Sequence, residues 1–205
     1  DVNARLKRAR SRDKTGNILA AREDYSSALE TQPEDARARL YRAELSIRKG
    51  DLGVAEADLR ALSSSGELET YDRVIALKFL GNIQVRQNKY AGAISFYRQA
   101  TSLGASASDP LTLKHVAESH YNLAQCLYVS KRFQESHDRF VLYARLAPAV
   151  GLALSPQDNY LMAVTAYLSG DFATANTYWP KADPQLRARA SRVLEDPSIN
   201  SKQFH

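Results

Sequence analysis

The chain has 205 residues, of which 44% are hydrophobic and 25% are charged, and its formal net charge is +5. The length suits one or two globular domains, and the charge favours acidic partners without identifying them. No stretch approaches the roughly 18 uninterrupted apolar residues of a membrane span, so we expect a soluble protein without one. The single cysteine, Cys126, excludes an internal disulfide. The sequence leaves the compartment open between cytoplasm and periplasm.

One phrase recurs along the chain. It begins at Gly16 as GNILAAREDYSSAL and at Gly50 as GDLGVAEADLRAL. Related phrases begin at Asn88, Lys131 and Gly170. The distance between the first two starts predicts a repeat of about 34 residues. The later starts are more widely spaced, which indicates extra residues between the later copies.

Each copy has the small residues that a close crossing of two helices needs. One stands in the middle of each expected first helix: Ala9, Ala43, Gly81, Ala124 and Ala163. The expected second helices carry a small residue, a large residue four positions later and a further residue three positions after that. These sets are Ala21-Tyr25-Ala28, Ala55-Leu59-Leu62, Ala93-Tyr97-Ala100, Ser136-Phe140-Tyr143 and Ala175-Trp179-Ala182. Because helices approach closely only where side chains are small, we expect Gly81 and Ala93 to mark a crossing, with Tyr90 and Tyr97 beside it.

This pattern resembles that of the tetratricopeptide repeat family. The matching copies span 2–35, 36–69, 74–107, 117–150 and 156–189. The resemblance implies an all-α fold, a right-handed α-solenoid of about five helical hairpins with a C-terminal capping helix, in which residues 1–205 form a single domain. One such repeat cannot bury its own apolar face, so the copies are expected to stack.

Two prolines mark helix starts after the extra residues. Asp109 is a predicted N-cap before Pro110, and Ser155 is a predicted N-cap before Pro156. The extra residues 108–116 are therefore expected to lengthen the fourth first helix by about two turns.

The last copy contains a further proline. Pro180 is expected to end or kink its second helix near Trp179. After a third N-cap at Asp183, the capping helix is expected at about 184–195.

No catalytic or metal-binding pattern stands out. His115 and His120 are five residues apart, which puts them on different sides of a helix, unlike the i, i+4 pair of a zinc helix. We interpret the histidines as exposed or packing side chains and predict no enzymatic activity, no cofactor and no metal. The glycine phrases lack the lysine of a nucleotide-binding loop. For Cys126 we favour a buried structural thiol over a reactive one.

Function is expected on the surface of the first helices, which lines the concave groove in the family. The resemblance carries these partner-binding positions to Arg10, Lys14, Arg37, Tyr41, Arg48, Lys78, Asn82, Arg86, Tyr121, Asn122, Gln125, Tyr128, Tyr160 and Tyr167. The set changes from basic to tyrosine-rich along the chain. This gradient suits a peptide or helix with acidic residues at one end and apolar anchors at the other. The alternative is that some tyrosines pack between neighbouring repeats.

A narrower resemblance concerns carboxylate capture. Some members of the family hold the C-terminal carboxylate of a chaperone tail with a lysine and two asparagines, helped by further basic residues. Lys78, Asn82 and Asn122 match this pattern, but Gln157 and Leu161 stand at the remaining basic positions. The match is therefore incomplete.

The resemblance implies a protein-binding scaffold or adaptor, of a kind frequent in bacterial envelope, pilus and secretion assemblies. One alternative is a self-associating scaffold that acts through its convex face, for example at Arg98 or Arg139. Nucleic-acid binding ranks lower, because basic and aromatic residues are segregated along the groove and are not interleaved. A homo-oligomer is compatible with these alternatives.

Overall fold

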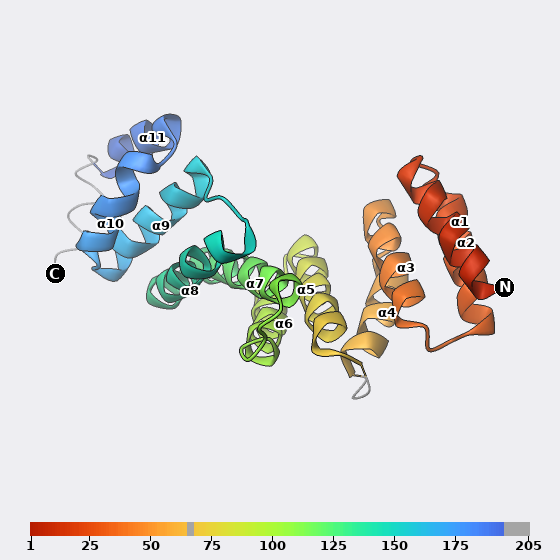
Figure 1. Ribbon diagram of the computed structural model, residues 1–205. Coiled ribbons are helices and arrows are strands. Elements are labelled where there is room, and N and C mark those ends of the chain that lie inside the picture. The colour runs from red at the N-terminus through yellow and green to blue at the C-terminus, as the bar shows by residue number, and fades with distance from the viewer. Residues whose placement is uncertain (65–67, 195–205) are drawn as a thin grey trace. The chain divides into compact units, whose positions relative to one another are not determined.

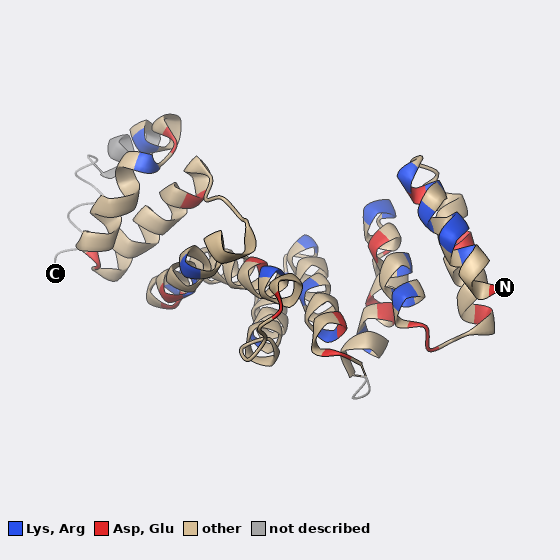
Figure 2. Cartoon of the chain, in the orientation of Figure 1, with Lys and Arg blue, Asp and Glu red and all other residues tan. Residues whose placement is uncertain are grey.

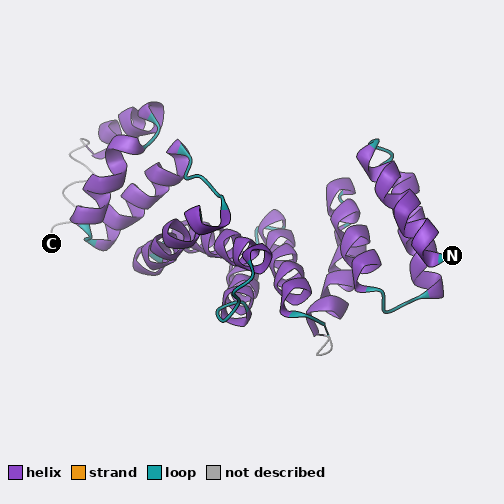
Figure 3. Cartoon of the chain, viewed as in Figure 1, coloured by secondary structure: helices purple, strands orange, loops and turns teal. Residues whose placement is uncertain are grey.

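The computed structural model describes residues 1–64 and 68–194, which form helices and no strand (Figure 3). The α-helices of these residues are α1 (Val2–Lys14), α2 (Ile18–Thr31), α3 (Ala36–Lys49), α4 (Leu52–Ser64), α5 (Thr70–Arg86), α6 (Tyr90–Leu103), α7 (Pro110–Val129), α8 (Phe133–Leu146), α9 (Pro156–Ser169), α10 (Phe172–Tyr178) and α11 (Pro184–Leu194). Two 3-10 helices, η1 (Pro148–Val150) and η2 (Trp179–Lys181), follow α8 and α10. Among the described residues, no helix is both long and apolar enough to cross a bilayer.

The chain divides into two compact units, Asp1–Ser119 (unit 1) and His120–His205 (unit 2), with the boundary inside α7. In unit 1, α1 packs on α2, α3 on α4 and α5 on α6, while α2 also contacts α3 and α4 contacts α5 (Figure 1). In unit 2, α9 contacts α8, α10 and α11. These neighbour-to-neighbour contacts confirm the all-α helical repeat. That both units form a single domain stays a prediction.

Side-chain caps set the helix starts that the sequence predicted. Asp109 accepts a hydrogen bond from a backbone amide three residues later at 2.8 Å. Ser155 and Asp158 form a capping box at the start of α9. At the start of α11, Asp183 accepts bonds from two backbone amides at 2.9 and 3.0 Å. All three predicted N-caps are therefore confirmed.

The first helices differ in length. Whereas α3 has 14 residues, α5 has 17 and α7 has 20. The predicted extension of the fourth first helix is confirmed, since α7 begins at Pro110. The extension of α5, which begins at Thr70, ahead of the third copy, was not predicted from the sequence.

The last hairpin is short, as its proline predicts. α10 ends at Tyr178, and Pro180 lies in η2, because proline lacks the N–H that a continuing helix needs. The expected capping helix is α11, which contacts α9. Its expected last residue, Glu195, lies outside the described residues.

At the crossing of α5 and α6, the Tyr97 ring fills the space that a side chain at position 81 would need. A Cβ added to Gly81 would meet ring atoms Cδ1 and Cζ of Tyr97 at 2.7 Å. Tyr97 is 1% exposed, and Ala93 is fully buried beside it on α6. The prediction that Gly81 and Ala93 mark a close crossing is confirmed.

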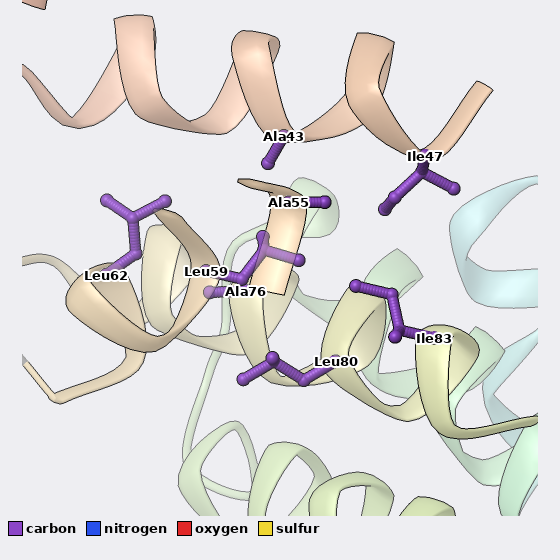
Figure 4. Close-up of a cluster of buried hydrophobic side chains, with 8 residues drawn as sticks. All are labelled: Ala43, Ile47, Ala55, Leu59, Leu62, Ala76, Leu80 and Ile83. Carbon is purple, nitrogen blue, oxygen red and sulfur yellow. The ribbon is translucent and has the colours of Figure 1, made fainter. Parts of the chain in front are cut away.

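A cluster of buried apolar side chains connects α3 and α4 of the second copy to α5 of the third (Figure 4). Its members are Ala43, Ile47, Ala55, Leu59, Leu62, Ala76, Leu80 and Ile83. Neither hairpin alone could remove these side chains from water, so burial across the boundary between copies stabilises both.

Two ion pairs with buried carboxylates occupy equivalent positions of the first and second copies, and neither was predicted from the sequence. Arg8 donates to Asp24 at 3.0 and 2.6 Å, and Arg42 donates to Asp58 at 2.8 and 2.7 Å. Asp24 and Asp58 are only 4% and 2% exposed. Each pair joins the first helix of a copy to its second helix. Asp24 has a further partner in Arg12, at 2.8 Å.

Candidate partner-binding surface

Arg10 and Tyr41 join the first helices α1 and α3. Nη2 of Arg10 donates a hydrogen bond to the Tyr41 hydroxyl at 2.6 Å, and Cζ of Arg10 lies 4.9 Å from the centroid of the Tyr41 ring. Tyr41 stacks on Tyr25, with ring centroids 5.6 Å apart. Burial raises the pKa of Tyr25 to about 12, so this phenol stays neutral near physiological pH. Arg10 itself is exposed.

Two more arginines connect successive first helices at their C-terminal ends. Arg48 of α3 pairs with Asp13 of α1 at 2.6 Å, and Arg86 of α5 donates to the backbone carbonyl of Ile47 of α3 at 2.8 Å. Each side chain reaches from its own copy to the preceding copy. We call the exposed cations at the predicted partner-binding positions of these three helices the basic face: Arg10, Lys14, Arg37, Arg48 and Arg86.

Lys78 lies in the contact between α5 and α7. Its side chain is 9% exposed, and its Nζ atom is 2.6 Å from Oε2 of Glu118 and 2.9 Å from Nδ1 of His115. Hydrogen bonds from His115 and Lys78 outweigh burial and lower the pKa of Glu118 to about 2. The positive charge of Lys78 is therefore balanced by the carboxylate of Glu118 inside unit 1. An incoming carboxylate would have to displace Glu118.

The asparagines of the partial carboxylate pattern lie in different units. Asn82 is half-buried on α5, and its Oδ1 atom accepts a hydrogen bond from the Tyr97 hydroxyl at 2.6 Å. This bond ties the side chain of Asn82 to the second helix of its own copy. Asn122 is half-buried in unit 2.

Tyr71 and His115 were not among the predicted surface positions, and their ring centroids lie 5.7 Å apart. Both come from the turns that make α5 and α7 longer than α3. Leu111, one turn before His115, is 64% exposed. The signal that could have found these residues is the extra sequence between the predicted copies, because extra helical turns bring additional side chains to the first-helix surface.

In unit 2, two predicted tyrosines pack against aromatic residues of their own copies. The ring centroids of Tyr121 and Phe140 are 5.8 Å apart, and those of Tyr160 and Trp179 are 6.2 Å apart. The second pair stands at the positions of the fifth copy that match those of the first pair in the fourth copy. Burial and a hydrogen bond with Asp158 raise the pKa of Tyr121. Both tyrosines thus contribute to packing inside their copies.

The other two tyrosines of unit 2 also occupy equivalent positions of these two copies. Tyr128 packs against Phe133 with ring centroids 5.8 Å apart, and Tyr167 packs against Phe172 with ring centroids 5.5 Å apart. Tyr167 and Phe172 are 40% and 58% exposed. Gln125, one turn before Tyr128, is half-buried on α7. Tyr167 and Phe172 are therefore an aromatic pair that a partner could reach.

The remaining titratable side chains form no metal centre in residues 1–64 and 68–194. His137 is 6% exposed, and its Nε2 atom lies 3.2 Å from Oδ2 of Asp171, the N-cap of α10. Burial lowers the pKa of His120 to about 4 and raises that of Cys126 to about 11. The prediction that Cys126 is buried is confirmed. His205 lies outside the described residues.

Successive helical hairpins with small residues at their crossings define a helical repeat protein. A family model described as "Tetratricopeptide repeat" matches residues 6–67 and 47–110. These matches together span more than half of the chain. The chain belongs to the tetratricopeptide repeat family.

Solved structures of other repeat proteins are similar in fold. PilF of Pseudomonas aeruginosa is 18% identical with a TM-score of 0.71, over 87% of this chain and 73% of that one. MamA is 14% identical with a TM-score of 0.68, over 93% of this chain and 94% of that one. YrrB, described as a tetratricopeptide repeat protein with an unusual peptide-binding site, is 18% identical with a TM-score of 0.68, over 94% of this chain and 92% of that one.

The sequence comparison with curated proteins gives no match. Because so few residues are identical, the structural similarities concern the fold alone. Together, family and fold support a protein–protein interaction scaffold.

Proposed function

We propose that this chain is an adaptor that binds an acidic segment of a protein partner along the basic face of unit 1. The observation that carries the proposal is the concentration of exposed cations on three successive first helices. The nearby acidic residues of these helices include Asp13, which pairs with Arg48, and the exposed Glu44. Cations therefore outnumber carboxylates on this surface, which attracts an acidic chain and orients it during encounter.

Neutral acceptors hold two of these arginines in place. Arg10 donates to the Tyr41 hydroxyl, and Arg86 donates to the carbonyl of Ile47, so neither bond cancels the positive charge. A guanidinium has five N–H donors, which leaves several for a carboxylate of the partner. Because these side chains are already ordered, binding costs less conformational entropy than it would for mobile arginines.

A second contact in unit 2 would take apolar or aromatic residues of the partner. Tyr167 and Phe172 support this proposal, since they are exposed large apolar side chains. Tyr121 and Tyr160 would contribute less, because each is half-buried against an aromatic neighbour. The peptide-binding site named for YrrB is an analogy for this use of the fold. The setting that we propose, an envelope, pilus or secretion assembly, rests on analogy within the family.

The test begins with affinity capture of a partner by the complete chain, with nuclease present, followed by measurement of binding rates. Lys14→Glu with Arg37→Glu reverses two exposed cations of the basic face. We expect association to slow by about 10-fold or more at low salt, with little change in the dissociation rate. The matched control, Lys7→Glu with Arg98→Glu, makes the same change in net charge at exposed positions outside the basic face.

Two results would contradict the proposal. If the control abolishes binding and the Lys14/Arg37 variant does not, the partner uses another surface, and the convex-face alternative is favoured. If binding disappears with nuclease, or falls with salt as steeply as phosphate contacts require, the ligand is a nucleic acid.

A further inference from the structure

Unit 1 carries a basic edge where each first helix turns into its second helix. Figure 2 shows Lys and Arg at the upper ends of α1, α3 and α5. The exposed cations at this edge are Lys14, Arg48, Lys49, Arg86 and Lys89. Two carboxylates at the same edge, Asp13 and Asp51, are each paired with an arginine, namely Arg48 and Arg22. Positive charge therefore remains in excess at each of the three turns.

The opposite edge of unit 1 is acidic. It consists of the connections from each second helix to the next first helix, two of which carry red segments at the lower side of unit 1 in Figure 2. Its carboxylates are Glu34, Asp35, Glu69, Asp72 and Asp109. Arg39 lies 3.4 Å from Glu34, yet the Glu34 side chain stays 92% exposed. Burial and the neighbouring Glu69 raise the pKa of Asp72, and Arg37 acts in the opposite direction. Arg37 and Arg39 therefore offset part of the negative charge of this edge. Such a cluster gains from a cation nearby.

Helix dipoles explain only part of this separation. Acidic residues at helix starts and basic residues at helix ends are favoured. The helices α1, α3 and α5 have acidic N-caps and basic last turns, although the first turns of α1 and α3 hold no acidic residue. The second helices run in the opposite direction, so the same rule would place acids at the basic edge and bases at the acidic edge. However, α2, α4 and α6 have no acidic residue in the first turn and no basic residue in the last turn. The second helices therefore do not cancel the charges that the first helices and the connections place at the two edges.

We propose that the basic edge of unit 1 binds the acidic edge of unit 1 in a second copy of this chain. Both edges carry one or two of these charged side chains at each helical hairpin of unit 1, so their charges recur with the period of the same repeat. Cations at successive turns of one copy can therefore meet carboxylates at successive connections of the other. The two surfaces differ, which makes the contact head-to-tail and allows further copies to add. Three cations of the basic edge, Lys14, Arg48 and Arg86, also belong to the basic face, so the test below uses Lys49 and Lys89, which do not.

The first test is the sedimentation velocity of the complete chain at increasing protein concentration. At about 50 mM salt we expect the weight-average sedimentation coefficient to rise with concentration. At about 500 mM salt the rise should disappear, because exposed charges are screened within a few ångströms. A chain that stays monomeric at every concentration in low salt would overturn the proposal.

The second test uses two variants that remove the contact from opposite sides. Lys49→Glu with Lys89→Glu removes the excess positive charge of the basic edge, and Glu34→Lys with Glu69→Lys removes the excess negative charge of the acidic edge. All four side chains are exposed and none belongs to the basic face. We expect each variant alone to remain monomeric. An equimolar mixture should associate again, since each variant retains one native edge that complements the other.

A mixture that stays monomeric while wild type associates would assign self-association to another surface and overturn the proposal. The control Lys7→Glu with Arg98→Glu has the same charge change as the Lys49/Lys89 variant and should associate like wild type. If wild type does not self-associate but binds anionic vesicles or nucleic acid through Lys49 and Lys89, the basic edge binds these anions and not a second copy. That result would overturn the proposal. Circular dichroism checks that every variant is folded. Loss of self-association with partner binding intact, or the reverse, separates this inference from the proposed function.

Discussion

The Lys78 ammonium and the Glu118 carboxylate lie 2.6 Å apart and join two first helices of unit 1, α5 and α7. The Lys78 side chain is 9% exposed, and that of Glu118 is 32% exposed. His115 completes the cluster at 3.2 Å from Glu118. Because a buried ammonium without a counter-ion is costly, this contact makes the alignment of α5 with α7 depend on ionisation.

Glu118→Gln should destabilise the protein near pH 7. The variant keeps the size of the side chain but leaves Lys78 without its anionic partner, so we expect the free energy of unfolding to fall by roughly 1–3 kcal/mol. Urea unfolding followed by circular dichroism measures this. Glu30→Gln, at an exposed position of α2, is the control and should have no effect.

The same pair predicts a pH dependence. Because the pKa of Glu118 falls from 4.5 to about 2 on folding, its contribution is complete above about pH 4.5 and is lost as the pH falls through about 2. Wild type should therefore lose more stability than Glu118→Gln across this window. Parallel slopes for the two proteins would show that the carboxylate of Glu118 does not stabilise the fold.

Gly81→Ala should destabilise the protein although alanine is the better helix former. Its Cβ would collide with the buried Tyr97 ring, and we expect a loss of roughly 1–3 kcal/mol from overpacking. Gly53→Ala is the matched control, because a Cβ at Gly53 meets no atom within 4 Å. Its melting temperature should be unchanged or slightly higher. Equal effects at the two glycines would contradict this account of the crossing.

The sequence predicted the parts of the fold that depend on short-range patterns. Gly81 and Ala93 were assigned to a helix crossing because small residues recur with the repeat, and Asp109 was assigned to a cap because Pro110 follows it. The cap rule acts within about four residues, and the crossing rule compares equivalent positions of successive copies. These rules did not predict the additional turn of α5, which begins at Thr70, before the start of the third copy.

The contacts of the candidate surface could not be predicted in the same way. Lys78 was expected to face a groove, but its partner Glu118 lies 40 residues further along the chain. Likewise, the neighbour of Tyr121 is Phe140 of the second helix. Contacts between residues so far apart depend on how helices rotate and pack, which a single repeat pattern does not determine.

Cys126 should react slowly with a thiol reagent in the native protein. It is 3% exposed, and its pKa of about 11 leaves little thiolate near pH 7. We expect labelling to be slower by about 10-fold or more than in urea-unfolded protein, as measured by mass spectrometry. Equal rates in the two states would show that the thiol is accessible.

Arg42→Ala should be among the most destabilising single substitutions. It leaves the carboxylate of Asp58, which is 2% exposed, without its bidentate partner. Breaking a buried pair in this way costs about 3–5 kcal/mol, which urea unfolding can measure. Arg8→Ala at the equivalent position should cost less, because Asp24 keeps Arg12 at 2.8 Å. The reverse order would mean that Arg12 cannot replace Arg8.

The third copy indicates how to remove the buried pair without this loss. In that copy, Leu80 and Phe96 stand at the repeat positions that Arg42 and Asp58 occupy in the second copy. Leu80 is 1% exposed and belongs to the apolar cluster of α3, α4 and α5. The free energy of unfolding of the double variant Arg42→Leu with Asp58→Phe should therefore lie within about 1 kcal/mol of the wild-type value. The reason is that the variant removes both charges together, so neither has to be desolvated on folding. If it loses as much stability as Arg42→Ala alone, the pair contributes more than an apolar contact could replace, and the equivalence of the two copies fails at this position.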